Sequence, residues 1–251
     1  MPSPLVTVAV PSLNQGEFLD AALGSIFSQD LPVEVFVLDG GSSDCSLEVI
    51  KRWEHRLAGW RSRPDEGQAA AINEGIAQGS APYVCWLNSD DLLLEGGMGA
   101  LIRGLDLCVD APFAYGRAWN HVESTGRRAP VWVEAFNVKR LALRCLVSQP
   151  ASLITRGAWN AVGGVDSGLQ CAMDYDLWWR LYTRFGAPCF VDEFVAVNRE
   201  HRGTKTRQLR RRHYREAIAT VRKHYGSVPL KWWLAQPYAV WFKSALGMSG
   251  Y

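Results

Sequence analysis

The sequence predicts an α/β fold with a mostly parallel, twisted sheet flanked by helices. Over the first 100 residues, short apolar runs alternate with amphipathic helical patterns, the order that produces βα units. The chain has 251 residues, 48% of them hydrophobic, which is enough to bury a sizeable core. Polar residues follow several of the apolar runs, at the positions where parallel sheets bind ligands.

The elements of the first 100 residues are expected in close succession. Pro11 ends the first apolar run, and Gly79 and Pro82 end the third helical pattern. The expected elements are a strand at 5–10, a helix from about 16, a strand at 33–38, helices at 46–56 and 69–78, and a strand at 83–87.

The second half is less regular. Residues 113–155 mix short strand-like runs with Trp-rich turns and predict no clear order. A helix is expected at 174–185, a strand at 189–197 and a basic helix at 208–225. We interpret residues 1–206 as the main domain and 207–251 as a basic, aromatic C-terminal helical appendage.

Composition excludes several classes of protein. A net charge of +2 does not favour nucleic-acid binding. The six cysteines form no C-x-x-C pair, which favours reduced thiols over disulfides. No apolar stretch reaches the roughly 20 residues that span a bilayer, and the N-terminus has no basic segment typical of a signal peptide. We therefore expect a cytoplasmic protein, soluble or peripheral on the inner face of the cell membrane.

Polar side chains stand at the carboxyl ends of the expected strands. Asn14 follows the first strand, Asp39 the second, and residues 88–91 the strand at 83–87. Because parallel strands end at one edge of a sheet, these groups are expected to converge in one crevice.

Five segments together carry a family resemblance. They are Val-Pro-Ser-Leu-Asn at 10–14, Asp-Gly-Gly-Ser-Ser-Asp at 39–44, Asp-Glu-Gly-Gln through Asn at 65–73, Asn-Ser-Asp-Asp at 88–91, and Met-Asp-Tyr-Asp-Leu-Trp-Trp-Arg at 173–180. In this order they resemble the inverting GT-A glycosyltransferases of family 2, over roughly residues 5–206. The resemblance implies a Rossmann-like GT-A fold and transfer of a sugar from a nucleotide-diphosphate sugar to an acceptor hydroxyl.

The Asn-Ser-Asp-Asp segment is the expected metal site. A departing diphosphate needs its charge neutralised, which a hard divalent cation on a carboxylate does well. The resemblance implies that Asp90 binds Mn or Mg and that Asn88 and Ser89 contact the donor. Asn88 stands where the family commonly has Asp, although an amide can bond ribose or a metal-bound water. The alternative is an acidic turn in which Asp91 caps the following helix.

A later basic segment is expected to close over the donor. The resemblance implies that His201 completes the metal shell, for which a neutral imidazole is suited. Arg202 and Lys205 would hold the diphosphate. The alternative for this segment is a solvated basic loop.

The resemblance also implies a nucleoside pocket. Asp39 precedes two glycines, where a backbone can approach a ligand closely, although a plain Asx-turn is the alternative. Asn73, on the helix that follows this region, is as well explained as a structural hydrogen-bonding residue. The implied pocket consists of Pro11, Leu13, Asn14, Asp39, Asp65 and Gly67.

Asp174 is the expected catalytic base. Inverting transfer needs one base to take the acceptor proton, and the resemblance places that base at Asp174, at a helix start that favours an ionised carboxylate. Met173 stands where the family commonly has Glu. The alternative is a helix N-cap. Gln149, Asp176 and Trp178 are the expected acceptor contacts, with a surface position for Asp176 and a core position for Trp178 left open.

The C-terminal segment combines arginines with aromatic residues. Arginines and Lys223 at 207–223 precede Trp232, Trp233, Tyr238, Trp241 and Phe242. This pattern favours contact with an anionic membrane surface. A packed helix pair and an oligomer contact are the alternatives.

Other functional classes fit less well. No G-x-G-x-x-G follows the first strand, and no P-loop motif is present. Residues 12–16 offer no basic pyrophosphate cradle of the kind that nucleotidylyltransferases carry. The remaining alternative is a catalytically silent glycan- or nucleotide-binding relative. The resemblance implies a glycan or lipid-linked glycan as the acceptor, and the donor base and sugar stay open.

Overall fold

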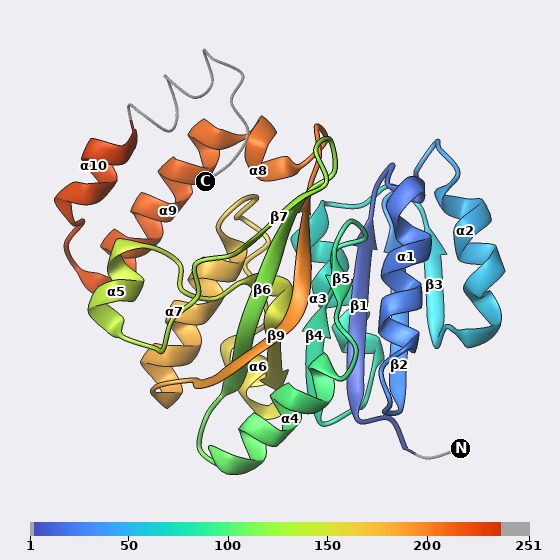
Figure 1. Cartoon of the computed structure of the whole chain (residues 1–251), viewed down its shortest axis with the longest axis horizontal. Helices are drawn as coiled ribbons and strands as arrows, with labels where there is room; N and C mark the ends of the chain where they lie inside the picture. Colours follow the sequence, from blue (N-terminus) through green and yellow to red (C-terminus); the bar gives the residue numbers. More distant parts are fainter. Residues whose placement is uncertain (1–2, 237–251) are drawn as a thin grey trace.

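The computed structural model describes residues 3–236, which form one nine-stranded sheet. The strand order is β3-β2-β1-β4-β8-β6-β9-β5, with β7 paired to β6 (Figure 1). The strands are β1 (Val6–Ser12), β2 (Val33–Asp39), β3 (Gly59–Ser62), β4 (Tyr83–Trp86), β5 (Leu92–Leu93), β6 (Phe113–Val122), β7 (Arg127–Pro130), β8 (Ser152–Thr155) and β9 (Cys189–Glu200).

The strand directions bring most carboxyl ends to one edge. β1, β2, β3 and β4 pair in parallel, and β6 and β9 run the same way. β5, β7 and β8 run against them. The mostly parallel sheet that the sequence predicts is thus confirmed, and the carboxyl ends of its parallel strands lie at the upper edge in Figure 1.

Helices cover both faces of the sheet. They are α1 (Gly16–Phe27), α2 (Ser46–Trp53), α3 (Gln68–Gln78), α4 (Gly97–Leu107), α5 (Val138–Leu143), α6 (Arg156–Val162), α7 (Met173–Phe185), α8 (Lys205–Gln208), α9 (Arg210–Tyr225) and α10 (Leu230–Gln236). α1, α2 and α4 share one apolar core with the sheet, and α3, α6 and α7 share another. Both cores exist because successive strand residues point to opposite faces.

Close packing fixes the helices on the sheet. A Cβ at Gly75 of α3 would lie 2.5 Å from a side-chain atom of Leu38 and 2.8 Å from the Cβ of Ala9. Only glycine lets α3 approach β1 and β2 so closely. Gln68, at the start of α3, is thereby held at the edge where the parallel strands end.

The C-terminal helices pack on the rest of the protein. Ala217 and Val221 of α9 share a third apolar core with Tyr175 and Trp179 of α7. Trp232 of α10 donates its indole N–H to the carbonyl of Ala142 at 2.8 Å. The packed helix pair is therefore what the structure shows for α9 and α10, and α8 crosses the boundary expected at residue 206.

The sequence missed two elements near the site. β3 extends the parallel sheet beyond β2, although Gly59–Ser62 lacks an apolar alternation. The second is β5, and it rules out the alternative in which Asp91 caps the following helix. β5 intervenes, and α4 begins at Gly97, after Gly96 in the N-cap position.

Candidate active site

Asp90 and His201 meet at the carboxyl edge of the sheet. The His201 Nε2 lies 3.0 Å from Asp90 Oδ2, although 111 residues separate them. Both side chains are largely buried, 14% exposed for His201 and 13% for Asp90. The amide of Gly203 donates to His201 Nδ1 at 3.2 Å, which turns Nε2 toward the carboxylate.

This pair suits a hard divalent cation. Adjacent ligands of an octahedral ion bound at about 2.1 Å lie about 3 Å apart, which matches the separation of the two side-chain atoms. Across residues 3–236, no group of three or more His, Cys, Asp or Glu side chains gathers at one point. Within the described residues, a cation at this point would therefore have Asp90 and His201 as its His, Cys, Asp or Glu ligands.

Asn88 belongs to a hydrogen-bonded chain beside this pair. Its Oδ1 accepts from Gln68 Nε2 at 2.7 Å, and its Nδ2 donates to Asp91 Oδ2 at 3.0 Å and to Gln149 Oε1 at 3.2 Å. Burial, and next the charge of Asp90, raise the pKa of Asp91 well above its usual range. A carboxyl group at position 88 would stand beside those of Asp90 and Asp91 and could not donate to Gln149, so an amide fits this chain better.

Gln15 and Arg199, which the sequence did not predict as site residues, also contact Asp90 and Asp91 at this edge. Gln15 Nε2 donates to Asp90 Oδ2 at 3.2 Å, and the backbone amide of Arg199 donates to Asp91 Oδ1 at 3.1 Å. The Arg199 guanidinium lies 4.9 Å from the centre of the Phe18 ring. The sequence did not predict that Arg199 contacts this edge, because its partners lie on α1 and in the 88–91 loop, far away in the sequence. The one signal was its position two residues before His201.

The loops after β1 and β2 interlock at the same edge. Asn14 has a positive φ of 52°, and its Oδ1 accepts from the amide of Ser43 at 2.9 Å. Asp39 is fully buried and accepts from the amides of Gly41 at 3.1 Å and Ser42 at 3.0 Å, which is the Asx-turn. Pro11 is buried, whereas Leu13 is 58% exposed beside this loop.

Asp65 and Gly67 form a second loop of the expected nucleoside pocket. Asp65 pairs with Arg61 at 2.9 Å, and its Oδ1 accepts the Gly67 amide at 2.9 Å. Gly67 has a φ of 106°, a conformation that favours glycine. This turn starts α3, which carries Gln68 into the chain with Asn88. Asn73, further along α3, bonds the backbone of Val165, a structural role.

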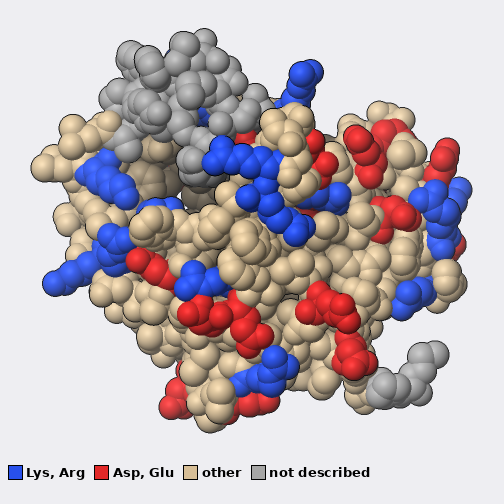
Figure 2. Space-filling view, viewed as in Figure 1, with Lys and Arg blue, Asp and Glu red and all other residues tan. Residues whose placement is uncertain are grey.

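Ser89 and Lys205 also lie at this edge. The Ser89 side chain is buried and its hydroxyl donates to Gln15. Lys205 Nζ donates to Gln68 Oε1 at 2.9 Å, and burial lowers the pKa of its ammonium. Arg202 is exposed. Figure 2 shows Lys and Arg side chains gathered on this side of the protein, over the upper ends of β6, β7 and β9.

Asp174 lies in the first turn of α7, near Lys205. Ala172 occupies the N-cap position, and Asp174 Oδ1 accepts the local amide of Tyr175 at 2.8 Å, so Asp174 is not the N-cap. Burial raises the pKa of Asp174 in spite of that amide and of the charges of His213 and Lys205. The helix start was expected to favour ionisation, but burial is the stronger influence. A raised pKa makes the carboxylate a stronger base.

Gln149 lies at the site, whereas Asp176 does not. Gln149 bonds Asn88 and donates to the Trp86 carbonyl at 2.8 Å. Asp176 is 1% exposed. Burial would raise its pKa, but hydrogen bonds from His224, Arg180 and Lys223 hold it well below the usual range. The expected acceptor contact and the alternative surface position of Asp176 are both wrong, because it ties α7 to α9.

Trp178 is also a core residue. It is fully buried and stacks on Phe113, with ring centres 4.7 Å apart, and on Trp86 at 6.2 Å. Trp179 is buried as well, against His224 of α9. Both indoles are buried because α7 packs on the sheet on one side and on α9 on the other. The acceptor contact expected for Trp178 is therefore wrong.

Several known proteins are similar to this chain in sequence. The chain is 26% identical over 203 residues to a PGL/p-HBAD biosynthesis glycosyltransferase of Mycobacterium bovis (strain BCG / Pasteur 1173P2), a match covering 78% of this chain and 76% of that protein. It is 25% identical over 183 residues to chondroitin synthase of Pasteurella multocida (strain Pm70), covering 71% of this chain. The matched region spans only 19% of that synthase.

Solved structures share the fold. TarS 1-349 of S. aureus in complex with UDP-GlcNAc superposes with a TM-score of 0.72 and 16% identity, over 89% of this chain and 67% of that one. Mannosyltransferase PcManGT of Pyrobaculum calidifontis, in complex with GDP-Man and Mn²⁺, gives a TM-score of 0.68 and 16% identity, over 100% and 77%. These likenesses confirm the expected GT-A architecture.

The family follows from the sequence match together with this geometry. Residues 7–144 match the model of glycosyl transferase family 2, more than half of the chain. The matched region contains the loops after β1, β2 and β4, and β9 brings His201 to Asp90 from outside it. The chain belongs to glycosyl transferase family 2.

Proposed function

We propose that this protein is an inverting glycosyltransferase that moves a sugar from a nucleoside-diphosphate donor to an acceptor hydroxyl. The observation that carries the proposal is the contact between Asp90 and His201. It lies at the sheet edge where α/β proteins bind ligands. Lys205 bonds Gln68, which in turn bonds Asn88 at this edge. The charge of Lys205 also lowers the pKa of Asp174, so this hydrogen-bonded chain connects the edge to the neighbourhood of Asp174.

Asp90 and His201 are the proposed ligands of Mn or Mg. Their separation and chemistry fit such an ion, and a structural neighbour was solved with Mn²⁺ and GDP-Man. When bound, the cation would neutralise the charge that develops on the departing diphosphate. Arg202 and Lys205 are proposed to add positive charge on the same side.

The donor is proposed to lie across the loops after β1, β2 and β3. Pro11 and Asp39 lie near the ends of β1 and β2, and Leu13, Asn14, Asp65 and Gly67 lie in the loops. Asn88, Ser89 and Asp90 follow β4. The Asp39 carboxylate already accepts hydrogen bonds from the amides of Gly41 and Ser42 and, at 2.6 Å, from the Ser62 hydroxyl. Its proposed part is therefore to shape the pocket wall. The solved neighbours hold UDP-GlcNAc and GDP-Man, so the donor base is left open.

Asp174 is the proposed general base. The acceptor oxygen would bond to the anomeric carbon while the bond to the diphosphate breaks on the opposite face, which inverts the anomeric centre. The proton of the acceptor hydroxyl passes to the Asp174 carboxylate. Gln149, at the same edge, is proposed to contact the acceptor, a glycan or lipid-linked glycan.

Release of nucleoside diphosphate separates this proposal from a silent relative. The purified chain, incubated with Mn and UDP-, GDP- or dTDP-sugars, is expected to release nucleoside diphosphate from one donor class by slow hydrolysis, and faster with an acceptor. Chromatography of the nucleotide measures this release. A protein that binds a nucleotide but releases none from any sugar donor would be the silent relative instead.

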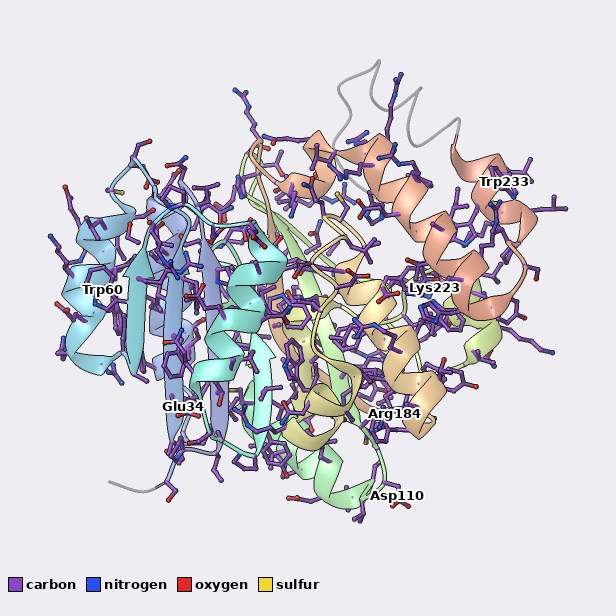
Figure 3. All side chains as sticks on the ribbon, turned by 180° about the vertical axis from the view of Figure 1, so that it is seen from behind. Glu34, Trp60, Asp110, Arg184, Lys223 and Trp233 are labelled. Carbon is purple, nitrogen blue, oxygen red and sulfur yellow. The ribbon has the colours of Figure 1, made fainter. Side chains whose placement is uncertain are left out.

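A second proposed partner is an anionic membrane on the cytoplasmic side. Within residues 3–236 no helix is long and apolar enough to cross a bilayer. α10 nevertheless exposes Leu230 by 76%, Trp233 by 45% and Leu234 by 77%, beside the exposed Lys231. Figure 3 shows Trp233 at the outer end of the molecule. Tyr238, Trp241 and Phe242 lie outside the described residues.

Changing Leu230, Trp233 and Leu234 together to Gln is expected to weaken binding to phosphatidylserine vesicles at least about tenfold. Burying even part of three such side chains contributes more than the 1.4 kcal/mol that a tenfold change requires. Co-sedimentation measures the binding. The matched control is Leu107→Gln with Val109→Gln, which are 86% and 85% exposed on α4 and just beyond it. Equal binding by the two variants would rule out α10 as the membrane contact.

A further inference from the structure

Two thiols meet where α4 packs on β9, at the lower end of the sheet in Figure 1. The Sγ atoms of Cys108, directly after α4, and Cys189, the first residue of β9, lie 2.6 Å apart, although 81 residues separate them. Both are free thiols in the structure. A disulfide bond is about 2.05 Å long, so a small movement of either side chain would bring the two sulfurs to bonding distance.

Gly104 on α4 holds the two cysteines at this contact. Its carbonyl accepts the Cys189 thiol at 3.2 Å and, from one turn further along the helix, the backbone amide of Cys108 at 3.0 Å. A Cβ at position 104 would lie 2.5 Å from Val191 Cγ2, so only glycine lets α4 approach β9 this closely. The meeting of the two thiols is therefore part of the native packing of α4 on β9.

The two thiols differ in their access to solvent. Cys189 is 7% exposed, and burial, followed by the hydrogen bond with Cys108, raises the pKa of its thiol to about 12. Cys108 is half-buried, and its neighbours Leu107 and Val109 are 86% and 85% exposed. Figure 3 shows Asp110, two residues after Cys108, at the lower rim of the molecule. A small oxidant therefore reaches Cys108 first, and Cys189 reacts with its neighbour.

We propose that Cys108 and Cys189 are a thiol–disulfide site that a small disulfide such as glutathione disulfide oxidises. The Cys108 thiolate attacks one sulfur of glutathione disulfide and forms a mixed disulfide, which releases one glutathione thiolate. Cys189 then attacks Cys108 Sγ, and its proton passes to the second departing glutathione. The Cys108–Cys189 bond forms, the two cysteines lose two electrons, and glutathione disulfide gains them.

This bond joins the two segments that carry the proposed metal ligands. From Asp90 the chain runs through β5 and α4 to Cys108, and from Cys189 it runs along β9 to His201. A cross-link between distant residues closes a long loop, which stabilises the native state mainly by restricting the unfolded chain. The oxidised protein should therefore hold Asp90 and His201 together up to a higher temperature. The significance of that result for metal binding rests on the proposed function, whereas the cross-link does not.

Mass spectrometry of the oxidised native protein tests the site without any assay of activity. After treatment with glutathione disulfide, alkylation of the remaining thiols and tryptic digestion, the peptide 104–117 is expected to be linked to the peptide 185–199. Cys108→Ser should lose the linked peptide, whereas Cys45→Ser, at an exposed thiol, should keep it. Glutathione on Cys45 together with unlinked peptides 104–117 and 185–199 would overturn the proposal.

Thermal unfolding tests whether the bond forms within the native packing. Oxidation should raise the midpoint of the wild type by roughly 5–15 °C, as expected when a disulfide closes a long loop in a chain of this size. Dithiothreitol should reverse the shift, and Cys108→Ser should show none. A linked protein whose midpoint equals or falls below that of the reduced protein would overturn the proposal. Neither measurement uses a nucleotide, so both stay decisive if the proposed glycosyltransferase function fails.

Discussion

Asp174→Asn is expected to lower turnover at least about 100-fold while the protein still binds nucleotide, the scale expected for loss of a general base. The Asn side chain has nearly the shape of the carboxylate, and its oxygen can still accept the hydrogen bond from the Tyr175 amide. It cannot act as the base that takes the acceptor proton. Release of nucleoside diphosphate in the presence of acceptor measures turnover. Nucleotide affinity should change little, because none of the loops after β1, β2 and β4 contacts Asp174 in the described hydrogen bonds.

The matched control is Asp166→Asn, a change of the same kind at an exposed position seven residues before α7. It should leave turnover unchanged. An unchanged rate in Asp174→Asn would assign the base elsewhere. Asp176 would not replace it, because hydrogen bonds from His224, Arg180 and Lys223 hold its pKa well below the usual range, which makes it a weak base.

Asp90→Ala is expected to abolish the manganese-dependent stabilisation of the protein by its nucleotide. UDP, GDP, dTDP and CDP are each compared with and without Mn in thermal unfolding. A ligand at 100 times its Kd stabilises the native state by about 2.7 kcal/mol. For a chain of this size that raises the midpoint by roughly 5–10 °C. The wild type should show this shift with one nucleotide class only.

The Asp90→Ala protein should itself fold. The charge of Asp90 raises the pKa of the buried Asp91, so removing it relieves a repulsion. Asp166→Ala, at an exposed position, is the control and should keep the full shift. A shift that survives in Asp90→Ala would move the metal site elsewhere. The absence of a shift with any nucleotide in the wild type would argue against a nucleotide donor.

The sequence was most informative where one element determines its own structure. The expected strands at 5–10, 33–38 and 83–87 became β1, β2 and β4, since buried parallel strands need continuous apolar runs. The sequence did not predict β3, because Gly59–Ser62 has no such apolar run and forms a strand through its pairing with β2. The 88–91 loop was recognised, but the role of Asp91 was not, because its partner is the amide of Arg199 on β9.

Side-chain environments were harder to predict than positions. Adjacent residues on a helix point to different sides, so the sequence left open which indole of Trp178 and Trp179 was core. Both are buried, since α9 covers the side of α7 that faces away from the sheet. The same packing hides Asp176. No local sequence pattern indicates that these side chains are buried, because the helix that covers them, α9, lies more than thirty residues further along the chain.

The sequence by itself determined the family, the parallel N-terminal sheet and the polar groups at its carboxyl edge, because periodicity and strand-end motifs are local. Only the tertiary structure decided which charges meet. It brought His201 to Asp90 across 111 residues and surrounded Asp176 with the hydrogen-bonding side chains of Arg180, Lys223 and His224. The physical reason is that pKa shifts and ion pairs depend on burial and on distances of a few ångströms between elements remote in sequence, which the packing of α7, α9 and β9 sets.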